Sequence, residues 1–171
     1  MLQLTKRFTN MFFWTLLMVT VAATSVHPGR NNRGKCLDVE GANGDLSQVY
    51  ISKAVTFMDC SGSATQDWEV RRGTTFIKLA GTDWCVDVGT HRRPPYGWHP
   101  ANGELAKLYP CGTLGHEAGQ TFEFKRNVFF VKEKALGDFC LDLRNGNLGP
   151  GNQLQMWNCH KHNPNQVFSI S

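Results

Sequence analysis

The chain has 171 residues, including six cysteines and 17 glycines, and its 18 basic and 14 acidic side chains give a net charge of +4. So small a charge gives no reason to expect a nucleic acid or an anionic membrane surface as partner. The length suits one domain with a hydrophobic core of its own.

The N-terminal stretch has the features of a secretory signal peptide. Lys6 and Arg7 precede an apolar run from Met11 to Ala23, and polar residues follow it. The run is too short to span a bilayer comfortably, and small residues at its end suit cleavage after Ala23. We therefore expect residues 1–23 to be a signal peptide and residues 24–171 to be one secreted, extracellular domain that does not insert into a membrane.

Three copies of one pattern follow along the chain. Each opens with Cys-x-Asp between hydrophobic residues, at Cys36, Cys85 and Cys140, and this alternation predicts a short strand with one buried face. Each copy then has a loop, a second cysteine and a Gln-x-aromatic motif. The second cysteines are Cys60, Cys111 and Cys159, and the motifs are Gln66–Trp68, Gln120–Phe122 and Gln166–Phe168. The order predicts repeats of about 30–72, 73–126 and 127–171.

The repetition also predicts how the cysteines pair. An even number of cysteines in a chain marked for export favours disulfides, but six cysteines allow 15 pairings. Equivalent bridges within each repeat leave one pairing: Cys36–Cys60, Cys85–Cys111 and Cys140–Cys159. Closing a loop of about 20 residues stabilises the fold by roughly 3 kcal/mol on the chain-entropy model.

Strand signals dominate the rest of the sequence. The runs "TFIKLA", "FEFK", "NVFFVKEK" and "VFSI" are rich in β-branched or aromatic residues, and Gly, Pro and Asn clusters separate them. An all-β domain follows, in which three like units bury their apolar faces in one core. The stretch before Cys36, "VHPGRNNRGK", is poorer in strand-forming residues and leaves closure of the barrel at the N-terminus open.

These motifs resemble those of the ricin B-type lectins, over about residues 30–171. The resemblance implies a β-trefoil of three repeats, each of which can carry a shallow sugar site. The usual ligand of such a site is galactose or N-acetylgalactosamine on glycans or glycoproteins, and the resemblance implies neither a cofactor nor catalysis. It also implies that the Gln-x-aromatic residues are mainly structural. Trp68, Phe122 and Phe168 are therefore expected to pack in the core, while the glutamines bind backbone groups.

The third repeat carries the most complete set of family site residues. Asp142 matches the acid that accepts sugar hydroxyls, Trp157 the aromatic platform, and Asn165 the amide that both donates and accepts. Gln155 and Gln166 are expected as side or supporting contacts. The Gly-rich loop after Asp142 would let the backbone approach a ligand closely.

The other two repeats depart from the family pattern. In the second, Asp87 and Tyr109 stand in the acid and aromatic positions, but Lys107 replaces the glutamine and Gly119 replaces the asparagine. This repeat also has an insertion with Tyr96 and Trp98 that either supplies a substitute contact or covers the pocket. Its ability to bind sugar is left open.

The first repeat keeps only the acid of the pattern. Asp38 is present, but Met58 and Thr65 replace the aromatic and the asparagine. A carboxylate alone selects few ligands. We therefore expect this site to be inactive.

Other classes of function are less well supported. The three aspartates belong to separate repeats, and a glycosidase needs two carboxyl groups within about 10 Å of each other. His160 and His162 lack a third ligand, so no metal is expected. The alternative is a protease inhibitor or host-directed effector that binds a host protease through the loop 90–104, where Pro94, Pro95 and Pro100 reduce the cost of ordering.

Overall fold

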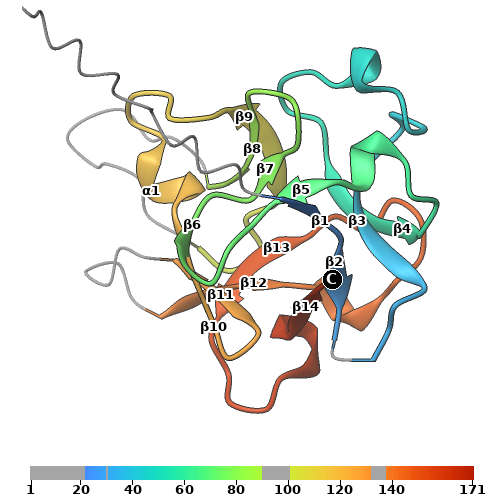
Figure 1. Cartoon of the computed structure of the whole chain (residues 1–171). Coiled ribbons are helices and arrows are strands. Elements are labelled where there is room, and N and C mark those ends of the chain that lie inside the picture. Colours follow the sequence, from blue (N-terminus) through green and yellow to red (C-terminus); the bar gives the residue numbers. More distant parts are fainter. Residues whose placement is uncertain (1–21, 30, 90–100, 132–137) are drawn as a thin grey trace, which may run out of the picture.

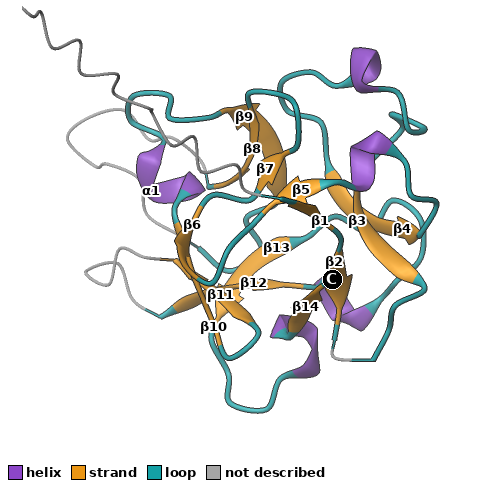
Figure 2. Cartoon of the chain, viewed as in Figure 1, coloured by secondary structure: helices purple, strands orange, loops and turns teal. Residues whose placement is uncertain are grey.

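The structure is a computed structural model that describes residues 22–29, 31–89, 101–131 and 138–171. Strands predominate, and the helices are single short turns (Figure 2). Among the described residues no helix combines the length and the apolar character needed to cross a membrane. The all-β expectation is confirmed.

Each repeat is built on one antiparallel hairpin that begins at its Cys-x-Asp motif (Figure 1). In all three hairpins the first cysteine lies opposite Met58, Tyr109 or Trp157, and the aspartate lies opposite Thr56, Lys107 or Gln155. The hairpins are β3 (Lys35–Val39) with β4 (Val55–Asp59), β8 (Trp84–Val88) with β9 (Ala106–Pro110), and β12 (Phe139–Asp142) with β13 (Gln155–Asn158). The shared register shows that these positions are equivalent by structure as well as by sequence.

Two larger sheets connect the repeats. One has the order β1-β5-β7-β8-β9 and the other β13-β12-β11-β10-β6. The new members are β1 (Ala23–Thr24), β5 (Trp68–Glu69), β6 (Gly73–Thr75), β7 (Lys78–Leu79), β10 (Phe122–Lys125) and β11 (Val128–Val131). Isolated bridges Ala54–Lys107, Thr56–Gln153 and Leu105–Gln155 join the second strands of the three hairpins. The three repeats therefore form one β-trefoil body.

The N-terminal stretch closes this body despite its weak strand signal. β2 (Val26–Pro28) pairs with β14 (Phe168–Ile170), so the two ends of the domain lie side by side (Figure 1). Ser25 and Ser171 exchange backbone hydrogen bonds of 3.0 and 3.1 Å. Pairing with the last strand thus orders a segment whose own sequence favours a strand only weakly.

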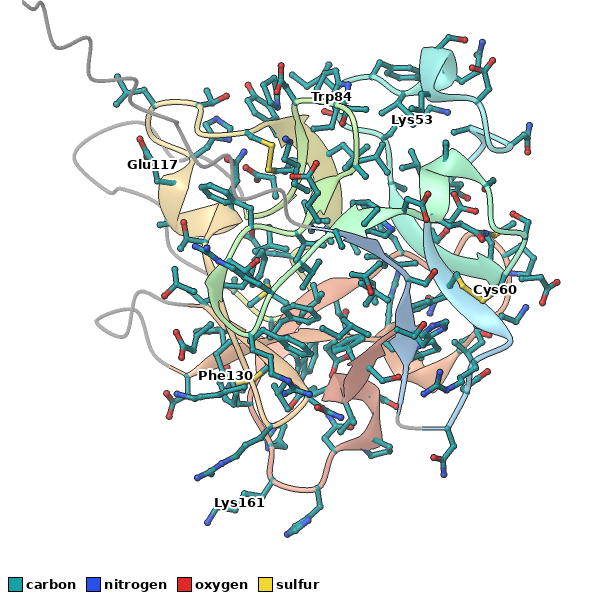
Figure 3. The ribbon with its side chains drawn as sticks, in the orientation of Figure 1. Lys53, Cys60, Trp84, Glu117, Phe130 and Lys161 are labelled. Atoms are coloured by element: carbon teal, nitrogen blue, oxygen red, sulfur yellow. A yellow bond between two sulfur atoms is a disulfide. The ribbon has the colours of Figure 1, made fainter. Side chains whose placement is uncertain are left out.

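The aromatic residues of the Gln-x-aromatic motifs form the centre of the core. Trp68, Phe122 and Phe168 are fully buried, and the Trp68 Nε1 atom donates to the Leu37 carbonyl at 3.0 Å. Phe129 lies between the second and third repeats, with ring centroids 6.2 Å from Phe122 and 5.6 Å from Phe168. Side chains from the strands fill the interior, whereas Lys161 projects outward (Figure 3).

The glutamines of the same motifs bind the backbone on both sides of each second cysteine. Gln66 accepts from the Ser61 amide at 2.8 Å and donates to the Asp59 carbonyl at 2.9 Å. The other two glutamines repeat this arrangement: Gln120 with Gly112 and Pro110, and Gln166 with His160 and Asn158. The glutamines therefore hold the end of each hairpin and the turn that follows it.

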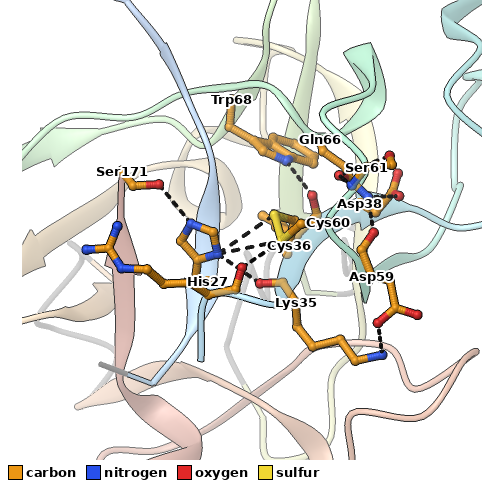
Figure 4. The surroundings of a disulfide bond; sticks show 12 residues. His27, Lys35, Cys36, Asp38, Asp59, Cys60, Ser61, Gln66, Trp68 and Ser171 are labelled. Carbon is orange, nitrogen blue, oxygen red and sulfur yellow. Dashed lines mark hydrogen bonds and ion pairs between the residues drawn. A yellow bond between two sulfur atoms is a disulfide. The ribbon is translucent and has the colours of Figure 1, made fainter. Parts of the chain in front are cut away.

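All three intra-repeat disulfides are present, as the repetition predicted. Figure 4 shows the surroundings of Cys36–Cys60, where the buried His27 lies against the two sulfur atoms. The His27 Nδ1 atom donates to the Lys35 carbonyl at 2.9 Å, and its Nε2 atom lies 2.9 Å from the Ser171 hydroxyl. These contacts tie the first repeat to the C-terminus.

Candidate binding site

The third repeat carries an open hollow of about 460 Å³. Its lining residues come from the β12–β13 hairpin, from the segments that follow each of these two strands, and from the second repeat. The lining residues are Gly103, Leu105, Asp142, Arg144, Asn145, Gln155, Trp157, Asn163 and Asn165. The structure thus brings together four of the five residues that the sequence singled out in this repeat.

Asp142 supplies the carboxylate of the hollow and is only 3% exposed. Its Oδ1 atom accepts from Gln155 Nε2 at 3.0 Å, and its Oδ2 atom accepts from Asn163 Nδ2 at 3.2 Å. Each carboxylate oxygen can accept a second hydrogen bond. Two neighbouring hydroxyl groups of a ligand could therefore bind to a carboxylate that the protein already holds in one orientation.

Trp157 supplies an apolar surface beside this carboxylate. It lies on β13, opposite Cys140, and is 36% exposed. Such exposure of a tryptophan lining a hollow leaves part of the indole available to a ligand. A flat ring of this kind covers apolar C–H groups with little loss of conformational freedom.

Asn165 reaches the hollow over a glycine. Gly146 has a φ of +65°, and a Cβ atom at this position would lie 2.9 Å from Asn165 Oδ1. The sequence predicted that glycines here let the backbone approach a ligand. At Gly146 the close neighbour is instead the Asn165 side chain, which no larger residue at 146 would accommodate in this position.

Gln166 does not line the hollow but binds the backbone next to it. Its side chain is almost fully buried, and its amide binds the His160 amide and the Asn158 carbonyl at 2.9 Å each. Of the two roles considered for it, the geometry corresponds to support. In the other repeats the equivalent glutamines also donate to the aspartate, at 2.8 Å from Gln66 to Asp38 and 3.2 Å from Gln120 to Asp87.

Asn163 is a lining residue that sequence reasoning missed. It caps the 3₁₀ turn Pro164–Gln166, because its Oδ1 atom accepts from the Asn165 amide at 3.0 Å, and its Nδ2 atom holds Asp142. An asparagine directly before a proline is a known start signal for such a turn. That signal could have identified the cap, although not its second bond to the carboxylate.

Leu105 could not be found by comparing the repeats, because it comes from the second repeat. It forms a bridge with Gln155 and is 40% exposed at the edge of the hollow. Gly103 reaches the same edge, since its amide donates to the Met156 carbonyl at 2.9 Å. The hollow is therefore shared between two repeats.

The second repeat has its acid and aromatic side chains in the equivalent places, but a histidine lies over them. The His116 ring stacks on Tyr109, with centroids 4.0 Å apart and an interplanar angle of 17°. Its Nδ1 atom lies 3.0 Å from Asp87 Oδ2. Lys107, in the position of Gln155, donates to the Gly89 carbonyl at 2.9 Å. Tyr96 and Trp98, which belong to the insertion expected either to supply a substitute contact or to cover the pocket, lie outside the described residues.

In the described part of the first repeat, no aromatic side chain stands at the platform position beside the acid. The Asp38 carboxylate accepts from the Val39 amide at 2.7 Å and from Gln66 at 2.8 Å. Thr56, opposite Asp38, and Thr65 are fully buried, and Met58 stands where the other repeats have an aromatic ring. Among the described residues, this repeat has neither an aromatic ring at the platform position nor an asparagine at the position of Asn165.

One cluster of possible metal ligands occurs in the described part of the chain: His27, Cys36 and Cys60, with ligand atoms within 4.8 Å of one another. Both sulfur atoms belong to a disulfide, so neither is available as a thiolate. His160 and His162 are exposed. The prediction that involved the loop 90–104 falls largely on residues 90–100, which lie outside the described residues.

The structure is a disulfide-bonded β-trefoil whose third repeat carries a surface hollow lined by a carboxylate, side-chain amides and an indole. A family model described as the ricin-type beta-trefoil lectin domain matches residues 25–166. The chain therefore belongs to the ricin-type beta-trefoil lectin family, whose domain binds carbohydrates and is not catalytic. No curated protein sequence matches the chain.

Solved structures share the same fold at low sequence identity. A designed threefold-symmetric protein, ThreeFoil, is 16% identical with a TM-score of 0.63, over 86% of this chain and 96% of that one. The C-terminal half of an earthworm R-type lectin, in complex with GalNAc, is 18% identical with a TM-score of 0.59, over 88% and 98%. A mosquitocidal holotoxin is 13% identical with a TM-score of 0.65, over 90% of this chain but only 17% of its own.

Proposed function

We propose that this protein is a secreted lectin that binds galactose or N-acetylgalactosamine at the ends of glycans through the hollow of the third repeat. The observation that carries the proposal is the convergence of Asp142, Trp157 and Asn165 on one open hollow. The GalNAc complex of the earthworm lectin, which has the same fold, supports this choice of ligand.

Each group in the hollow has a chemical role in this proposal. The Asp142 carboxylate accepts hydrogen bonds from two adjacent sugar hydroxyls, and Trp157 covers the face of galactose that presents several C–H groups. Asn165 both donates and accepts, so it distinguishes between hydroxyl orientations. These three contacts match a pyranose better than a flat aromatic or a purely charged ligand.

The affinity of one such site is expected to be low. A shallow hollow commonly binds a monosaccharide with a Kd of ~1 mM, or about −4 kcal/mol, so tight binding requires several sites acting together. A protein with one open site would bind glycans weakly unless it associates with further copies.

A glycan array with the purified, oxidised protein tests the proposal. We expect binding to glycans that end in galactose or N-acetylgalactosamine, and its loss in Trp157→Ala. Absence of binding to every glycan, or binding unchanged by the substitution, would refute the assignment of the site. Protease inhibition or effector activity through the loop 90–104 is the alternative, and no observation on the described residues favours it.

A further inference from the structure

A second open hollow lies directly beside the hollow of the third repeat. Its volume is about 510 Å³, close to the 460 Å³ of the first, and both volumes are in the range of ligand sites. Gly103 and Leu105 line both hollows. Leu105 is 40% exposed where the two hollows meet, so a ligand in the first hollow can continue across this side chain into the second.

All three repeats contribute to the second hollow. Ser52 comes from the first repeat, Lys107 from the second and Gln153 from the third. The isolated bridges Ala54–Lys107 and Thr56–Gln153 place these segments next to one another where the repeats join. The second hollow is therefore not one of the three equivalent sites that a threefold repetition predicts, and comparing the repeats could not have found it.

Backbone hydrogen bonds hold the walls of the second hollow in place. The Ser52 amide donates to the Leu108 carbonyl at 2.9 Å. On the edge shared with the first hollow, the Gly103 amide donates to the Met156 carbonyl, also at 2.9 Å. The two hollows thus have a fixed relative position, which lowers the cost of binding one ligand across both of them.

The second hollow offers both donors and acceptors of hydrogen bonds. The Lys107 ammonium group has three donors and places one of them on the Gly89 carbonyl at 2.9 Å. The Gln153 Nε2 atom donates to the Ala106 carbonyl, and the oxygen of the same amide is an acceptor. Ser52 adds a hydroxyl group on an exposed residue. This mixture matches the hydroxyls of a sugar, each of which can donate and accept.

We propose that the glycan site extends over both hollows. A galactose-type unit binds in the hollow of the third repeat, and the next saccharide unit of the same glycan binds in the second hollow, against Lys107 and Gln153. The proposal rests on the function proposed for the third repeat and adds its substrate class, which is a disaccharide or a longer glycan. The second unit raises the affinity because it adds contacts within one continuous site.

The test compares methyl β-galactoside with a panel of disaccharides. The panel carries a terminal galactose on each hydroxyl position of a second pyranose in turn, in both anomeric forms. Each sugar is titrated into the oxidised protein, and the backbone amide signals are followed by NMR. We expect at least one disaccharide to bind about tenfold more tightly than methyl β-galactoside. It should shift the amide signals of Ser52, Lys107 and Gln153, which methyl β-galactoside should leave in place.

Two variants locate the gain in affinity. Lys107→Met and Gln153→Met remove the polar ends of these side chains but keep most of their length, and each should lower the ratio of disaccharide to monosaccharide affinity. Lys161→Met and Gln48→Met are the matched controls, since both residues are exposed and line neither hollow, and Lys161 projects outward (Figure 3). The controls should keep the wild-type ratio. Because the ratio compares two ligands of one protein, a partial loss of folded protein affects both alike.

The outcomes separate this inference from the proposed function. If methyl β-galactoside binds but no disaccharide binds more tightly, or if the disaccharides shift only signals around the hollow of the third repeat, the inference is wrong and the proposed function stands. A ratio that falls equally in the controls would also overturn the inference. If no sugar of the panel binds the wild type, the proposed function itself is refuted. Should neither variant fold, the wild-type affinities and shifts alone decide.

Discussion

Gln155 donates a 3.0 Å hydrogen bond to Asp142, the residue directly opposite it in the β12–β13 hairpin. In the other two repeats the residue opposite the aspartate is Thr56 or Lys107, and Lys107 donates to Gly89 instead. The third repeat thus holds its carboxylate with a neutral side chain from the next strand. Opposite Asp142 the third repeat therefore has the neutral side chain of Gln155, where the second repeat has the cation of Lys107 opposite Asp87.

Replacing Asp142 by asparagine should abolish sugar binding. The variant loses the charge that accepts two hydroxyls, and its new NH2 group faces one of the two donors that bind Asp142, Gln155 Nε2 or Asn163 Nδ2, so the free energy of unfolding should fall by about 1–3 kcal/mol. Binding is measured by the glycan array and stability by urea denaturation. Asp38→Asn is the matched control, because Asp38 is also buried and bound by a glutamine. A comparable loss of binding in this control would contradict the assignment to the third repeat.

Trp157→Ala should separate binding from stability. The side chain is 36% exposed, so its removal should change the thermal midpoint little while weakening binding about tenfold or more. Tyr50→Ala removes another exposed aromatic side chain, 57% exposed, and should leave binding as it is. Equal effects of the two substitutions would show that Trp157 has no special role.

Gly146→Ala should weaken binding through Asn165. A methyl group at 146 would lie 2.9 Å from Asn165 Oδ1 and displace this side chain from the hollow. Gly62→Ala is the control: its φ is +69°, close to that of Gly146, but no atom lies within 4 Å of the added carbon. Both variants should lose about 1–2 kcal/mol of stability from the left-handed backbone. Only Gly146→Ala should reduce affinity, and a loss in both would point to a general effect on the fold.

Trp68→Ala should destabilise the whole domain. Trp68 is fully buried and donates to the Leu37 carbonyl, so we expect a loss of about 3–5 kcal/mol in the free energy of unfolding, measured by urea denaturation. Trp68→Phe keeps most of the buried apolar surface and should cost less. A small loss with alanine would mean that the core does not depend on this aromatic side chain.

The repetition of the sequence made the all-β class and the disulfides predictable, because one pattern in three copies restricts the cysteine pairing more than any single motif, and the resemblance to the ricin B-type lectins supplied the β-trefoil. Local strand signals were less informative where partners decide the outcome: β2 forms because β14 pairs with it, although "VHPGRNNRGK" favours strands only weakly. Asp142, Trp157, Asn165 and Gln155, which line the hollow, were singled out because they match site positions of the ricin B-type lectins, to which the repeats are similar.

Other parts of the site depend on contacts that no repeat pattern encodes. Leu105 reaches the hollow from a neighbouring repeat, and Asn163 binds Asp142 as a second role of a turn cap. His116 stacks on Tyr109 from the start of a turn that is one residue longer than its counterpart in the third repeat. Such contacts follow from the packing of whole side chains in three dimensions.

Saturation-transfer NMR with methyl β-galactoside measures most directly whether the Trp157 indole contacts a bound sugar. Magnetisation from the protein should reach mainly the protons on the C–H face of galactose, and the transfer should vanish in Trp157→Ala. Transfer that is absent from the wild type, or that persists without the indole, would contradict the central claim.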